Sequence, residues 1–492
     1  METAHNLYAV LREGFADRLD AVFLRIAGGD SIVTYREIDA QSDRLAAVLG
    51  EHGVRPGDRV VVQVGKSVDA VALYLACLRA GAVYVPLNEA YTDDEVAYFV
   101  DDAQPALVLR CSLDELIAQA ARTAPLGSVA DRTGQTAAML YTSGTTGKPK
   151  GAMLTTENLA SNGRALAELW GFTADDVLLH ALPIFHVHGL FVALHCAMLS
   201  GCEVRFLPRF DVGAVRAALP GSTVMMGVPT FYSRLLADPG FGTDDCRTMR
   251  LFISGSAPLT ESVHAAFAER TGHRILERYG MTETGMITSN PLDGERIAGT
   301  VGHPLPEVEI CVVDDSGAPC PTGLVGVVEV RGPNVFAGYW HMPEKTAASF
   351  RDGDGDGDGD GAGDQFDWFV TGDLGSVDAD GRLTLAGRGT DLIISGGLNV
   401  YPKEIELVLD DVPGVVESAV VGVPHPDLGD GVVAVIVAAA GFDPATIATA
   451  LDGRLARFKH PKHVALVADL PRNAMGKVEK AALRRTYADV FG

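Results

Sequence analysis

YTSGTTGKPKG, residues Tyr141–Gly151, lies between two apolar runs, AAML before it and AML after it. The pattern predicts a loop between two strands, and its glycines and small hydroxyl residues leave backbone N–H groups free to surround a phosphate chain. Lys148 and Lys150 add positive charge. The spacing differs from the Gly-x-x-x-x-Gly-Lys of the Walker P-loop, which excludes a GTPase-like site at this position. Because such a run is more often a plain turn when it stands alone, its meaning depends on the rest of the chain.

The segments on both sides of this loop alternate between strand and helix patterns. Before it, the strand runs RVVVQV, AVYVPL and ALVL are separated by helices predicted at Val68–Arg79 and Thr92–Asp102. After it, the alternation continues through VLLHALP, EVRFLP, TVMMGVP and RLFISG. This alternation predicts an α/β fold with parallel or mixed sheets that helices cover on both faces. Open sheets of this kind bind ligands at the carboxyl ends of their strands, so we expect the site at that edge.

The pattern changes after Gly299. VEICVVDDSG, GVVEVRG and RLTLAGR predict antiparallel strands of a small β-barrel-like subdomain, and the residues beyond Asp391 have strands and an amphipathic helix of their own. A chain of 492 residues is also too long for a single core. We therefore predict a large N-terminal domain at residues 1–388 and a separate small α+β domain at residues 391–492.

Composition restricts the classes of function. The 40 basic and 64 acidic side chains give a formal charge of −24, which argues against a nucleic-acid partner. The N-terminal segment lacks a signal-peptide pattern, and the hydrophobic run Val71–Leu78 is too short to cross a bilayer. The seven cysteines include no Cys-x-x-Cys pair, which favours buried free thiols. We expect a cytoplasmic protein with small-molecule partners and no membrane contact, and the sequence leaves its oligomeric state open.

DGDGDGDGDGAGD, at Asp352–Asp364, is compositionally unusual. Several of its aspartates have the spacing of a calcium-binding loop, but Asp367 stands where such a loop has a bidentate glutamate, and no helix pattern flanks the repeat. We therefore expect a solvated insertion here rather than a calcium site.

Further motifs follow the first loop in a fixed order, namely FISGSAPL at 252–259, ERYGMTETG at 277–285, VTGDLG at 370–375, GRGTDLIISGGLNVYPKEIE at 387–406 and PRNAMGKVEK at 471–480. Together these segments resemble the motifs of the superfamily of acyl-CoA synthetases, adenylation domains and luciferases. The likeness covers essentially the whole chain. It implies an enzyme that uses ATP and Mg²⁺ to join a carboxylic acid to AMP and then transfers the acyl group to coenzyme A.

The resemblance also implies a nucleotide site. Thr282 would contact the α-phosphate, and Glu283 would hold Mg²⁺, a hard cation that prefers oxygen ligands. Tyr279 would stack on the adenine, and Asp373 would accept both ribose hydroxyls with Arg388 beside it. The other residues implied to bind the nucleotide are Thr142, Ser143, Gly144, Thr145, Thr146 and Lys148 around the phosphates, and Ser256, Ala257, Glu277, Arg278, Gly280 and Met281 around the rest.

Lys477, in a Gly-Lys turn near the C-terminus, corresponds to the catalytic lysine of the superfamily. Its ammonium group would stabilise negative charge on the carboxylate and α-phosphate oxygens while the acid attacks. In these enzymes the small domain then swings about a hinge, which falls at Thr390, and presents a loop to the coenzyme A tunnel. That loop corresponds to Ser395, Gly396 and Gly397. Relatives usually have Asp or Lys at the hinge, so Thr390 departs from the pattern.

The residues expected around the acid indicate its chemical class. FHVHGLFVAL, Phe185–Leu194, supplies histidines but no carboxylate that could hold a substrate amine, which disfavours amino acids. Arg278 and Arg234 would not suit the apolar tunnel of a fatty-acid enzyme, and they predict a second carboxylate on the substrate. His186 is a candidate for both catalysis and acyl binding, together with Gly280 and Ser256. A solvent-facing Arg234 is an equally weighted alternative.

PIFHVHGLFVALH, VPTFYSRLL and ERYGMTETGMITSNP most resemble malonyl-CoA synthetases. Malonate is therefore the expected acid, with methylmalonate as a second substrate. One methyl group is worth only about 1–3 kcal/mol of discrimination, so the sequence leaves both open. The alternatives are a ligase for another short carboxylic acid and an adenylating enzyme that loads a carrier protein.

Overall fold

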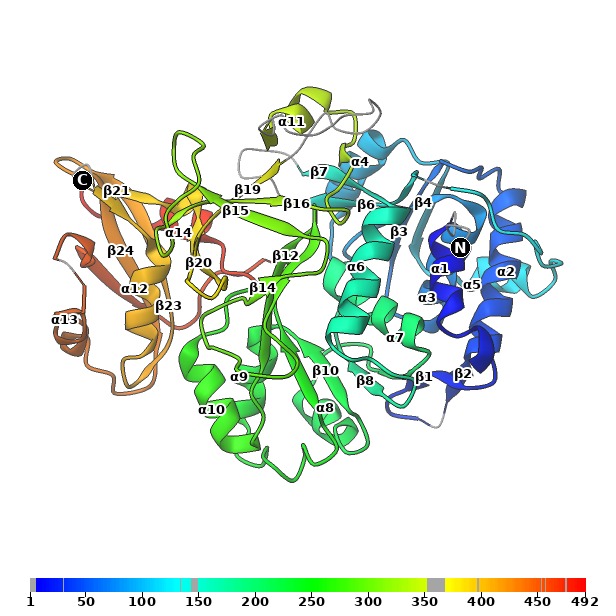
Figure 1. Ribbon diagram of the computed structural model, residues 1–492, viewed down its shortest axis with the longest axis horizontal. Helices are drawn as coiled ribbons and strands as arrows, with labels where there is room; N and C mark the ends of the chain where they lie inside the picture. The colour runs from blue at the N-terminus through cyan, green and yellow to red at the C-terminus, as the bar shows by residue number, and fades with distance from the viewer. Residues whose placement is uncertain are drawn as a thin grey trace.

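The computed structural model describes residues 6–29, 31–132, 134–142, 149–351, 368–395, 398–452, 454–455, 457–473 and 476–492. The Asp-Gly repeat at 352–364 lies outside these ranges. The described strands form four sheets, and helices pack against three of them in α/β layers (Figure 1). The predicted α/β class is confirmed.

The largest sheet has nine strands, and its middle is parallel. At one edge an antiparallel hairpin extends it, and at the other edge the last strand is antiparallel as well. The strand order is β14 (His303–Pro304), β13 (Gly285–Ser289), β12 (Leu276–Met281), β11 (Leu251–Ser254), β10 (Val224–Gly227), β8 (Val177–His180), β9 (Glu203–Phe206), β1 (Val22–Ile26) and β2 (Ile32–Thr34).

A second sheet of six strands contains the segments on both sides of the predicted phosphate loop. β6 and β7 form an antiparallel hairpin in which Thr142 pairs with Lys150, so the predicted strands before and after the loop are confirmed. The order is β17 (Gly338–Tyr339), β7 (Lys150–Thr155), β6 (Thr136–Thr142), β4 (Val83–Pro86), β3 (Arg59–Val64) and β5 (Leu107–Cys111).

Helices α1, α3, α6 and α7 lie between these two sheets and carry much of the main core (Figure 1). All residues of α3 from Ala70 to Arg79 are buried, which suits the hydrophobic run at its centre. Ser67 caps its first turn, and Gly81 ends it in the left-handed conformation with φ +71°. The helices of this part of the chain are α1 (Leu7–Glu13), α2 (Tyr35–Glu51), α3 (Val68–Ala80), α4 (Asp93–Ala103), α5 (Asp114–Ala120), α6 (Thr156–Leu169), the π-helix His188–Leu194, α7 (His195–Ser200), α8 (Val212–Ala218), α9 (Pro229–Ala237) and α10 (Glu261–Thr271), with a 3₁₀ turn at Ala16–Arg18.

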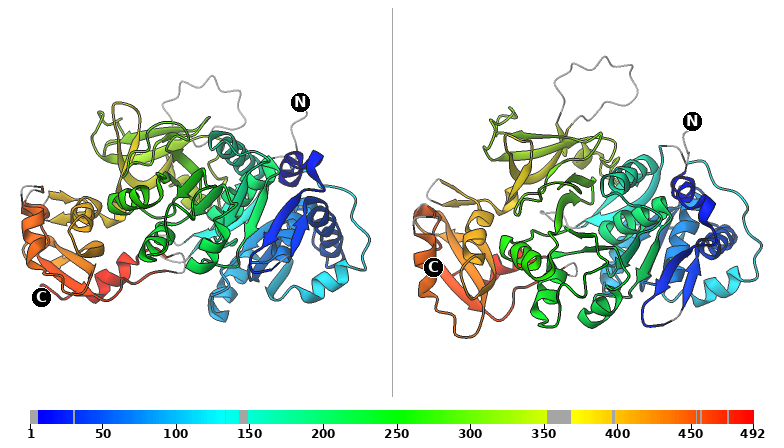
Figure 2. Two further views of the ribbon diagram at one scale, coloured as in Figure 1. Left: turned by 90° about the horizontal axis from the view of Figure 1, so that it is seen from below. Right: turned by 60° about the horizontal axis from the view of Figure 1, so that its bottom comes forward.

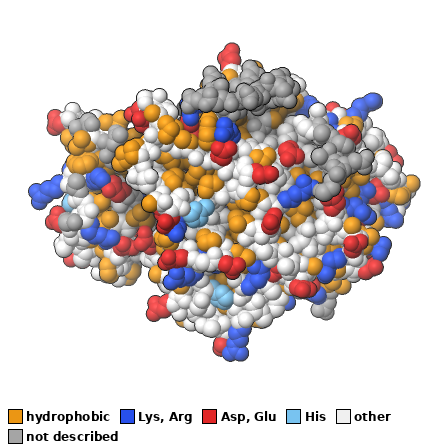
Figure 3. All heavy atoms as spheres, in the orientation of Figure 1, with side chains coloured by type: hydrophobic (Ala, Val, Ile, Leu, Met, Phe, Trp, Pro, Cys, Tyr) orange, Lys and Arg blue, Asp and Glu red, His pale blue; other side chains and the backbone are white. Residues whose placement is uncertain are grey.

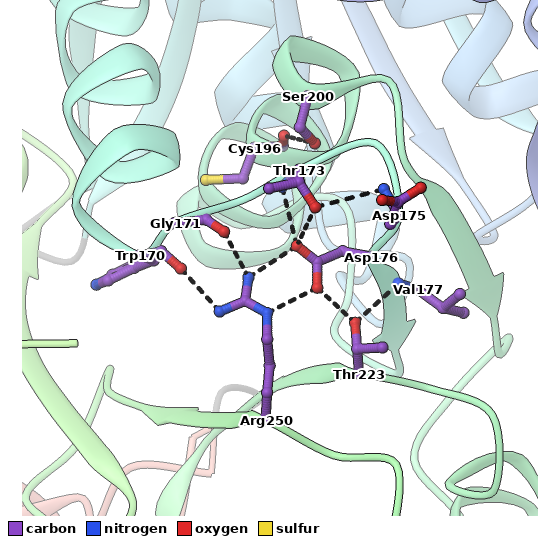
Figure 4. A network of polar contacts seen from close by, with 10 residues as sticks. All are labelled: Trp170, Gly171, Thr173, Asp175, Asp176, Val177, Cys196, Ser200, Thr223 and Arg250. Carbon is purple, nitrogen blue, oxygen red and sulfur yellow. Dashed lines mark hydrogen bonds and ion pairs between the residues drawn. The ribbon is translucent and has the colours of Figure 1, made fainter. Parts of the chain in front are cut away.

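An arginine-centred network ties the amino ends of the strands in the large sheet to α6 (Figure 4). The Arg250 guanidinium donates to both carboxylate oxygens of Asp176, at 2.7 and 2.8 Å. It also donates to the carbonyl oxygens of Trp170 and Gly171, just beyond α6, at 3.0 and 2.9 Å. Thr223 completes the network by donating its hydroxyl to Asp176 at 2.6 Å. This edge of the sheet is therefore fastened by groups that satisfy one another.

The third sheet is antiparallel, as its sequence pattern predicted. It has five strands and ends at Arg388, which pairs with Asp373 across β19 and β20. Its strands are β15 (Glu309–Val313), β16 (Gly326–Arg331), β18 (Phe350–Arg351), β19 (Trp368–Val377) and β20 (Leu383–Arg388), and the short helix α11 (Pro343–Ala347) precedes β18.

A short 3₁₀ turn, Gly389–Asp391, leads to the fourth sheet, which has its own apolar clusters. This last part of the chain lies at one end of the molecule, next to the third sheet and away from the N-terminal residues (Figure 2). Its elements are β21 (Ile393–Ser395), β22 (Leu398–Val400), α12 (Pro402–Asp410), β23 (Val415–His425), β24 (Gly429–Ala438), α13 (Ala445–Leu451), the 3₁₀ turn Arg457–Lys459, β25 (His463–Val467) and α14 (Lys480–Thr486).

The cysteines can be compared with the expectation that they are buried free thiols. Four cysteines are buried free thiols, but the prediction is wrong for Cys111, which ends strand β5 and is exposed. Cys311 and Cys320 are half-buried. Acidic and basic side chains are interspersed over the face seen in Figure 3.

Candidate active site

The carboxyl ends of three neighbouring strands meet at one edge of the large sheet. Gly227 at the end of β10 pairs with Ser254 at the end of β11, and Ser254 pairs with Glu277 in β12. α9 begins directly after β10, and the loop that leaves β11 starts at the same edge. Most of the predicted site residues described by the structure lie along this edge or face it from the third and fourth sheets.

Arg278 in β12 is a buried cation with unused donors. Its side chain and backbone together are 3% exposed, and Nε and one terminal nitrogen have no hydrogen-bond partner among the described residues. Burial lowers the pKa of its guanidinium to about 9, although Tyr232 and Glu277 act in the opposite direction. A Cβ on Gly255 would lie 2.3 Å from Cζ of Arg278, so only glycine leaves room for the guanidinium there. Among the described residues, no acidic side chain forms an ion pair with this buried positive charge.

Two histidines of the FHVHG segment lie close to Arg278. Nδ1 of His188 is 3.3 Å from Oγ of Ser256, and its Nε2 is buried without a partner in the described structure. Burial, followed by the charge of Arg278, holds the pKa of His188 well below its ordinary value. Burial and the charges of Lys477 and Arg278 lower the pKa of His186 to about 3. Both rings are therefore neutral at neutral pH.

Ser256 itself has an unusual backbone. Its φ is +70°, a left-handed conformation that few residues other than glycine adopt. This conformation turns the chain after Gly255 and sets the Ser256 hydroxyl beside His188. Strained backbone of this kind is common at ligand sites, where the surrounding structure maintains it.

The turn between β12 and β13 holds Thr282 and Glu283. The two strands approach so closely here that a Cβ on Gly280 would lie only 2.1 Å from the carbonyl oxygen of Gly285. Glu283 is buried, and its Oε1 accepts hydrogen bonds from the hydroxyls of Thr142, at 3.3 Å, and Tyr339, at 3.0 Å. Thr142 ends strand β6, which leads toward the predicted phosphate loop, so the hairpin and the end of this strand meet at the carboxylate.

Glu283 suits Mg²⁺ as a shared ligand rather than as part of a protein cage. The described residues contain no group of three or more His, Cys, Asp or Glu side chains that could hold a metal. Mg²⁺ commonly binds one or two carboxylates and takes its other ligands from water and substrate phosphates. A single buried carboxylate beside the end of β6 fits that mode.

Asp373 forms a second buried acidic centre. It accepts a hydrogen bond from the Tyr279 hydroxyl and an ion pair from Nε of Arg388 at 2.9 Å. Burial, and then the charge of Asp373, raises the pKa of Tyr279 well above its ordinary value, so this phenol stays protonated and keeps donating. The three side chains, which the sequence placed around adenine and ribose, are brought into direct contact.

Lys477 reaches this region from the last part of the chain. Its turn is closed by hydrogen bonds in both directions with Asn473, and the next residue toward the N-terminus, Gly476, lies beside Thr230 at the start of α9. The Lys477 side chain is accessible to solvent, but protein surrounds it, and this desolvation lowers its pKa together with the charge of Arg388. Asp373 and Glu283 act in the opposite direction.

Comparison with known proteins agrees with this geometry. The family described as AMP-binding enzyme matches residues 11–340, and the AMP-binding enzyme C-terminal domain matches residues 404–477. The chain belongs to the AMP-binding enzyme family. It is an acid–thiol ligase, and ATP and coenzyme A are its co-substrates.

Individual relatives match most or all of the chain. The malonate–CoA ligase of Arabidopsis thaliana is 35% identical over 88% of this chain and 79% of its own. The indoleacetate–CoA ligase of Aromatoleum aromaticum is 33% identical over 93% of both chains. The crystal structure of ATP-bound MatB from Rhodopseudomonas palustris is 47% identical and superposes with a TM-score of 0.94 over 100% of both chains.

The hinge predicted for this family lies in the 3₁₀ turn between the third and fourth sheets. Thr390 is exposed, and its carbonyl oxygen accepts a hydrogen bond from Arg484 at 3.2 Å. Arg484 also forms an ion pair of 2.7 Å with Asp391. Ser395, the described residue of the predicted coenzyme A loop, is buried at the end of β21.

No helix in the described parts of the chain is long and apolar enough to cross a membrane.

The remaining predicted residues differ in their burial, and some lie outside the described ranges. Ala257, Met281 and Thr282 are half-buried at the site edge. Glu277 is buried, accepts a hydrogen bond from the Leu259 amide at 3.3 Å, and has a pKa raised by burial to about 7. The predicted residues that lie outside the described ranges are Ser143, Gly144, Thr145, Thr146, Lys148, Gly396 and Gly397.

Arg234 does not share the environment of Arg278. It lies on α9 with an exposed side chain, and it forms no hydrogen bond or ion pair with another residue among those the structure describes. The Arg234 side chain therefore faces solvent in this conformation, as the alternative interpretation expected. The structure brings Arg278, but not Arg234, into the buried cluster, and a role for Arg234 toward the acid stays a prediction.

Sequence reasoning missed several residues of the site. Tyr339 reaches Glu283 because β17 pairs with β7, a contact between segments far apart in the chain. Gly255 was quoted only as part of a motif, although its missing side chain makes room for Arg278. Lys66 donates to Nδ1 of His180 at 2.7 Å, and no acidic partner accompanies it in the described structure. No local pattern marks these residues, since each acts through a tertiary contact.

Proposed function

We propose that this acid–thiol ligase activates a small dicarboxylic acid, with malonate as the principal substrate and methylmalonate as the next. The observation that carries this proposal is the buried guanidinium of Arg278, whose Nε and one terminal nitrogen lack acceptors among the described residues. An ionised carboxylate at the far end of the acid would supply two acceptor oxygens and a neutralising charge.

The energetic argument favours a diacid over a monoacid. Leaving a buried charge without its partner costs about 3–5 kcal/mol in proteins where such a pair has been broken. A substrate with a second carboxylate removes that cost on binding, whereas an apolar tail would increase the desolvation of the guanidinium. A site built around a charged donor therefore rejects the analogue that lacks the acceptor.

The relatives support this choice of acid without deciding it. A malonate–CoA ligase matches the chain at 35% identity, but an indoleacetate–CoA ligase matches at 33%. Family membership alone is therefore compatible with several acids. A ligase for another short carboxylic acid is the alternative, and Arg278 is the reason to rank a diacid above it.

In the first half-reaction, a carboxylate oxygen of the acid attacks the α-phosphorus of ATP, and the bond to pyrophosphate breaks. We propose that Lys477 stabilises the negative charge on the carboxylate and α-phosphate oxygens, as an ammonium group in a partly desolvated site can. Thr142 and Thr282 would contact the phosphates. Mg²⁺, held by Glu283, would neutralise charge on the departing pyrophosphate.

The nucleoside would be held by the second acidic centre. Asp373 would accept the ribose hydroxyls, and the Tyr279 hydroxyl and Arg388 keep its carboxylate oriented. In the second half-reaction the sulfur of coenzyme A bonds to the acyl carbon while the bond to AMP breaks. We propose that residues 391–492 turn about Thr390 between the two steps, so that the Ser395 loop replaces Lys477 at the site.

The test is CoA-dependent formation of AMP across an acid panel, with the thioester identified by mass spectrometry. The panel contains malonate, methylmalonate, acetate and 3-methylbutyrate, in which two methyl groups replace the distal oxygens of malonate. We expect kcat/KM for malonate to exceed that for acetate and 3-methylbutyrate by at least about 100-fold, the discrimination of a site with an unpaired buried polar group. Equal turnover of malonate and acetate would contradict the proposal.

A further inference from the structure

We infer that His188 determines specificity together with Arg278, because it presents a neutral Nε2–H donor to the distal carboxylate of the acid. This inference rests on the proposed function and adds a residue to it. Sequence reasoning noted His188 only for the carboxylate that its segment lacks. The structure gives it an unpartnered polar atom in a buried position beside the arginine.

We assign the ring proton of His188 to Nε2, with the Ser256 hydroxyl as the donor to Nδ1. Burial and the nearby charge of Arg278 keep the ring neutral, so one nitrogen is a donor and the other an acceptor. Nδ1 lies 3.3 Å from the Ser256 hydroxyl, which can donate to it. The proton then resides on Nε2, and that N–H has no acceptor among the described residues.

His188 and Arg278 are connected through a short stretch of backbone. The Arg278 guanidinium lies against the α-carbon of Gly255, and the next residue, Ser256, contacts His188. Three buried nitrogens, Nε and one terminal nitrogen of Arg278 and Nε2 of His188, thus lack hydrogen-bond partners among the described residues. These unpartnered nitrogens of Arg278 and His188 match an ionised carboxylate, whose oxygens are all acceptors.

Other buried histidines of the same region differ from His188. His180 uses both ring nitrogens, since Nε2 contacts the Gly189 carbonyl oxygen at 2.9 Å and Nδ1 accepts from Lys66 at 2.7 Å. His195 also has an unpartnered nitrogen, but burial is the sole cause of its pKa shift. Its neighbour is the Tyr74 hydroxyl, at 2.8 Å. An unused nitrogen next to a buried cation is found at His188.

Two substitutions separate the donor from the rest of the ring. The amide nitrogen of His188→Gln can occupy the position of Nε2 and donate, whereas the shorter His188→Asn reaches only the position of Nδ1. We expect His188→Asn to lower kcat/KM for malonate by about 10- to 100-fold, the usual loss of a hydrogen bond to a charged group. His188→Gln should stay within about threefold of the wild type, and neither should lower kcat/KM for 3-methylbutyrate.

Controls make the outcomes distinct. Thermal unfolding of both variants checks that they fold, and His264→Asn, which removes a buried imidazole bonded to the Ile275 carbonyl oxygen, controls for loss of a buried ring. Equal losses with both acids, or equal malonate losses in the Asn and Gln variants, would overturn the inference. If the wild type itself does not prefer malonate to 3-methylbutyrate, the proposed function fails instead.

Discussion

Two arginines at opposite edges of the large sheet have opposite relations to their surroundings. Arg250, before β11, is satisfied by Asp176 and by two carbonyl oxygens at the end of α6 (Figure 4). Arg278, in β12, is more deeply buried but has two nitrogens without acceptors in the described structure. This difference is the basis for proposing that Arg250 stabilises the fold and that Arg278 binds the substrate.

The acidic side chains at the two edges follow the same division. Asp176 is buried, and burial alone would raise its pKa, but hydrogen bonds from Arg250 and Thr223 lower it. The Glu277 side chain accepts only the Leu259 amide among the described residues, and burial outweighs this bond and raises its pKa to about 7. The fold stabilises charge at the amino edge of the sheet and tolerates unfavourable charge at the carboxyl edge, where we propose that the substrates bind.

Replacing Lys477 tests the unsatisfied edge most severely. Lys477→Ala should lower the rate of adenylate formation by about 100- to 1000-fold, because a preorganised positive charge is lost where negative charge develops. Thioester formation from supplied acyl-adenylate should be spared, since the lysine serves the first step. Pyrophosphate exchange and coenzyme A acylation measure the two halves separately, and equal loss of both would show that the lysine is not specific to adenylation.

Arg250→Leu tests the satisfied edge. We expect it to reduce the free energy of unfolding by about 2–4 kcal/mol, because Asp176 and two carbonyl groups lose their donor while Asp176 stays buried. Urea unfolding measures this loss. Arg247→Leu is the matched control, since its partner Asp244 and Arg247 itself are exposed, and little change is expected there. A change in acid preference in Arg250→Leu would contradict the assignment of a purely structural role to the amino edge.

Glu277→Gln should change how stability depends on pH. A folded pKa of about 7, above the ordinary 4.5, means that the folded protein binds more protons than the unfolded chain between these values. Glu277 therefore costs stability as the pH rises from 4.5 to 7. The variant should therefore be more stable than the wild type at pH 8. Its advantage in the free energy of unfolding should be about 2–3 kcal/mol larger at pH 8 than at pH 5. Parallel stability curves for the variant and the wild type would mean that the carboxyl is not strained.

Gly255→Ala should disturb Arg278 without removing it. A methyl group there would overlap the guanidinium, which must move to accept it. We expect kcat/KM for malonate to fall about tenfold, the effect of displacing one charged contact. Gly50→Ala on α2, where the added methyl meets nothing within 4 Å, should leave kinetics unchanged. Unaltered malonate kinetics in Gly255→Ala would show that the exact position of Arg278 does not matter.

Arg278→Leu gives the smallest expected change in stability, and its sign is opposite to that of Arg250→Leu. Without substrate, the unpaired charge is replaced by an apolar side chain, so the free energy of unfolding should stay the same or rise by about 1 kcal/mol. Urea unfolding of the ligand-free protein measures this. A loss as large as that in Arg250→Leu would make Arg278 a structural residue.

Local patterns in the sequence predicted much of the fold. The alternation of short β-branched runs with helices indicated the parallel sheets, and the runs that flank Thr142 and Lys150 indicated the β6–β7 hairpin. The family resemblance implied that Arg388 lies beside Asp373, as it does, but it did not indicate the hydrogen bond from Tyr279 to Asp373. These features depend on neighbours in the chain or on motifs that are complete in themselves.

What the sequence could not predict depends on distant packing. Arg234 and Arg278 were grouped because both are arginines near site motifs, but α9 exposes the first while β12 buries the second. Tyr339 reaches Glu283 only through the pairing of β17 with β7. The unused nitrogens of Arg278 are likewise a property of the assembled sheet, since a sequence does not show which donors find acceptors.

The most direct test compares kcat/KM for malonate and for 3-methylbutyrate in the wild type and in Arg278→Leu. If Arg278 pairs with the distal carboxylate, the ratio of the two values should fall by at least about 100-fold in the variant, with the loss confined to malonate. If both acids lose activity in parallel and the ratio is unchanged, Arg278 does not select the acid and the account is wrong.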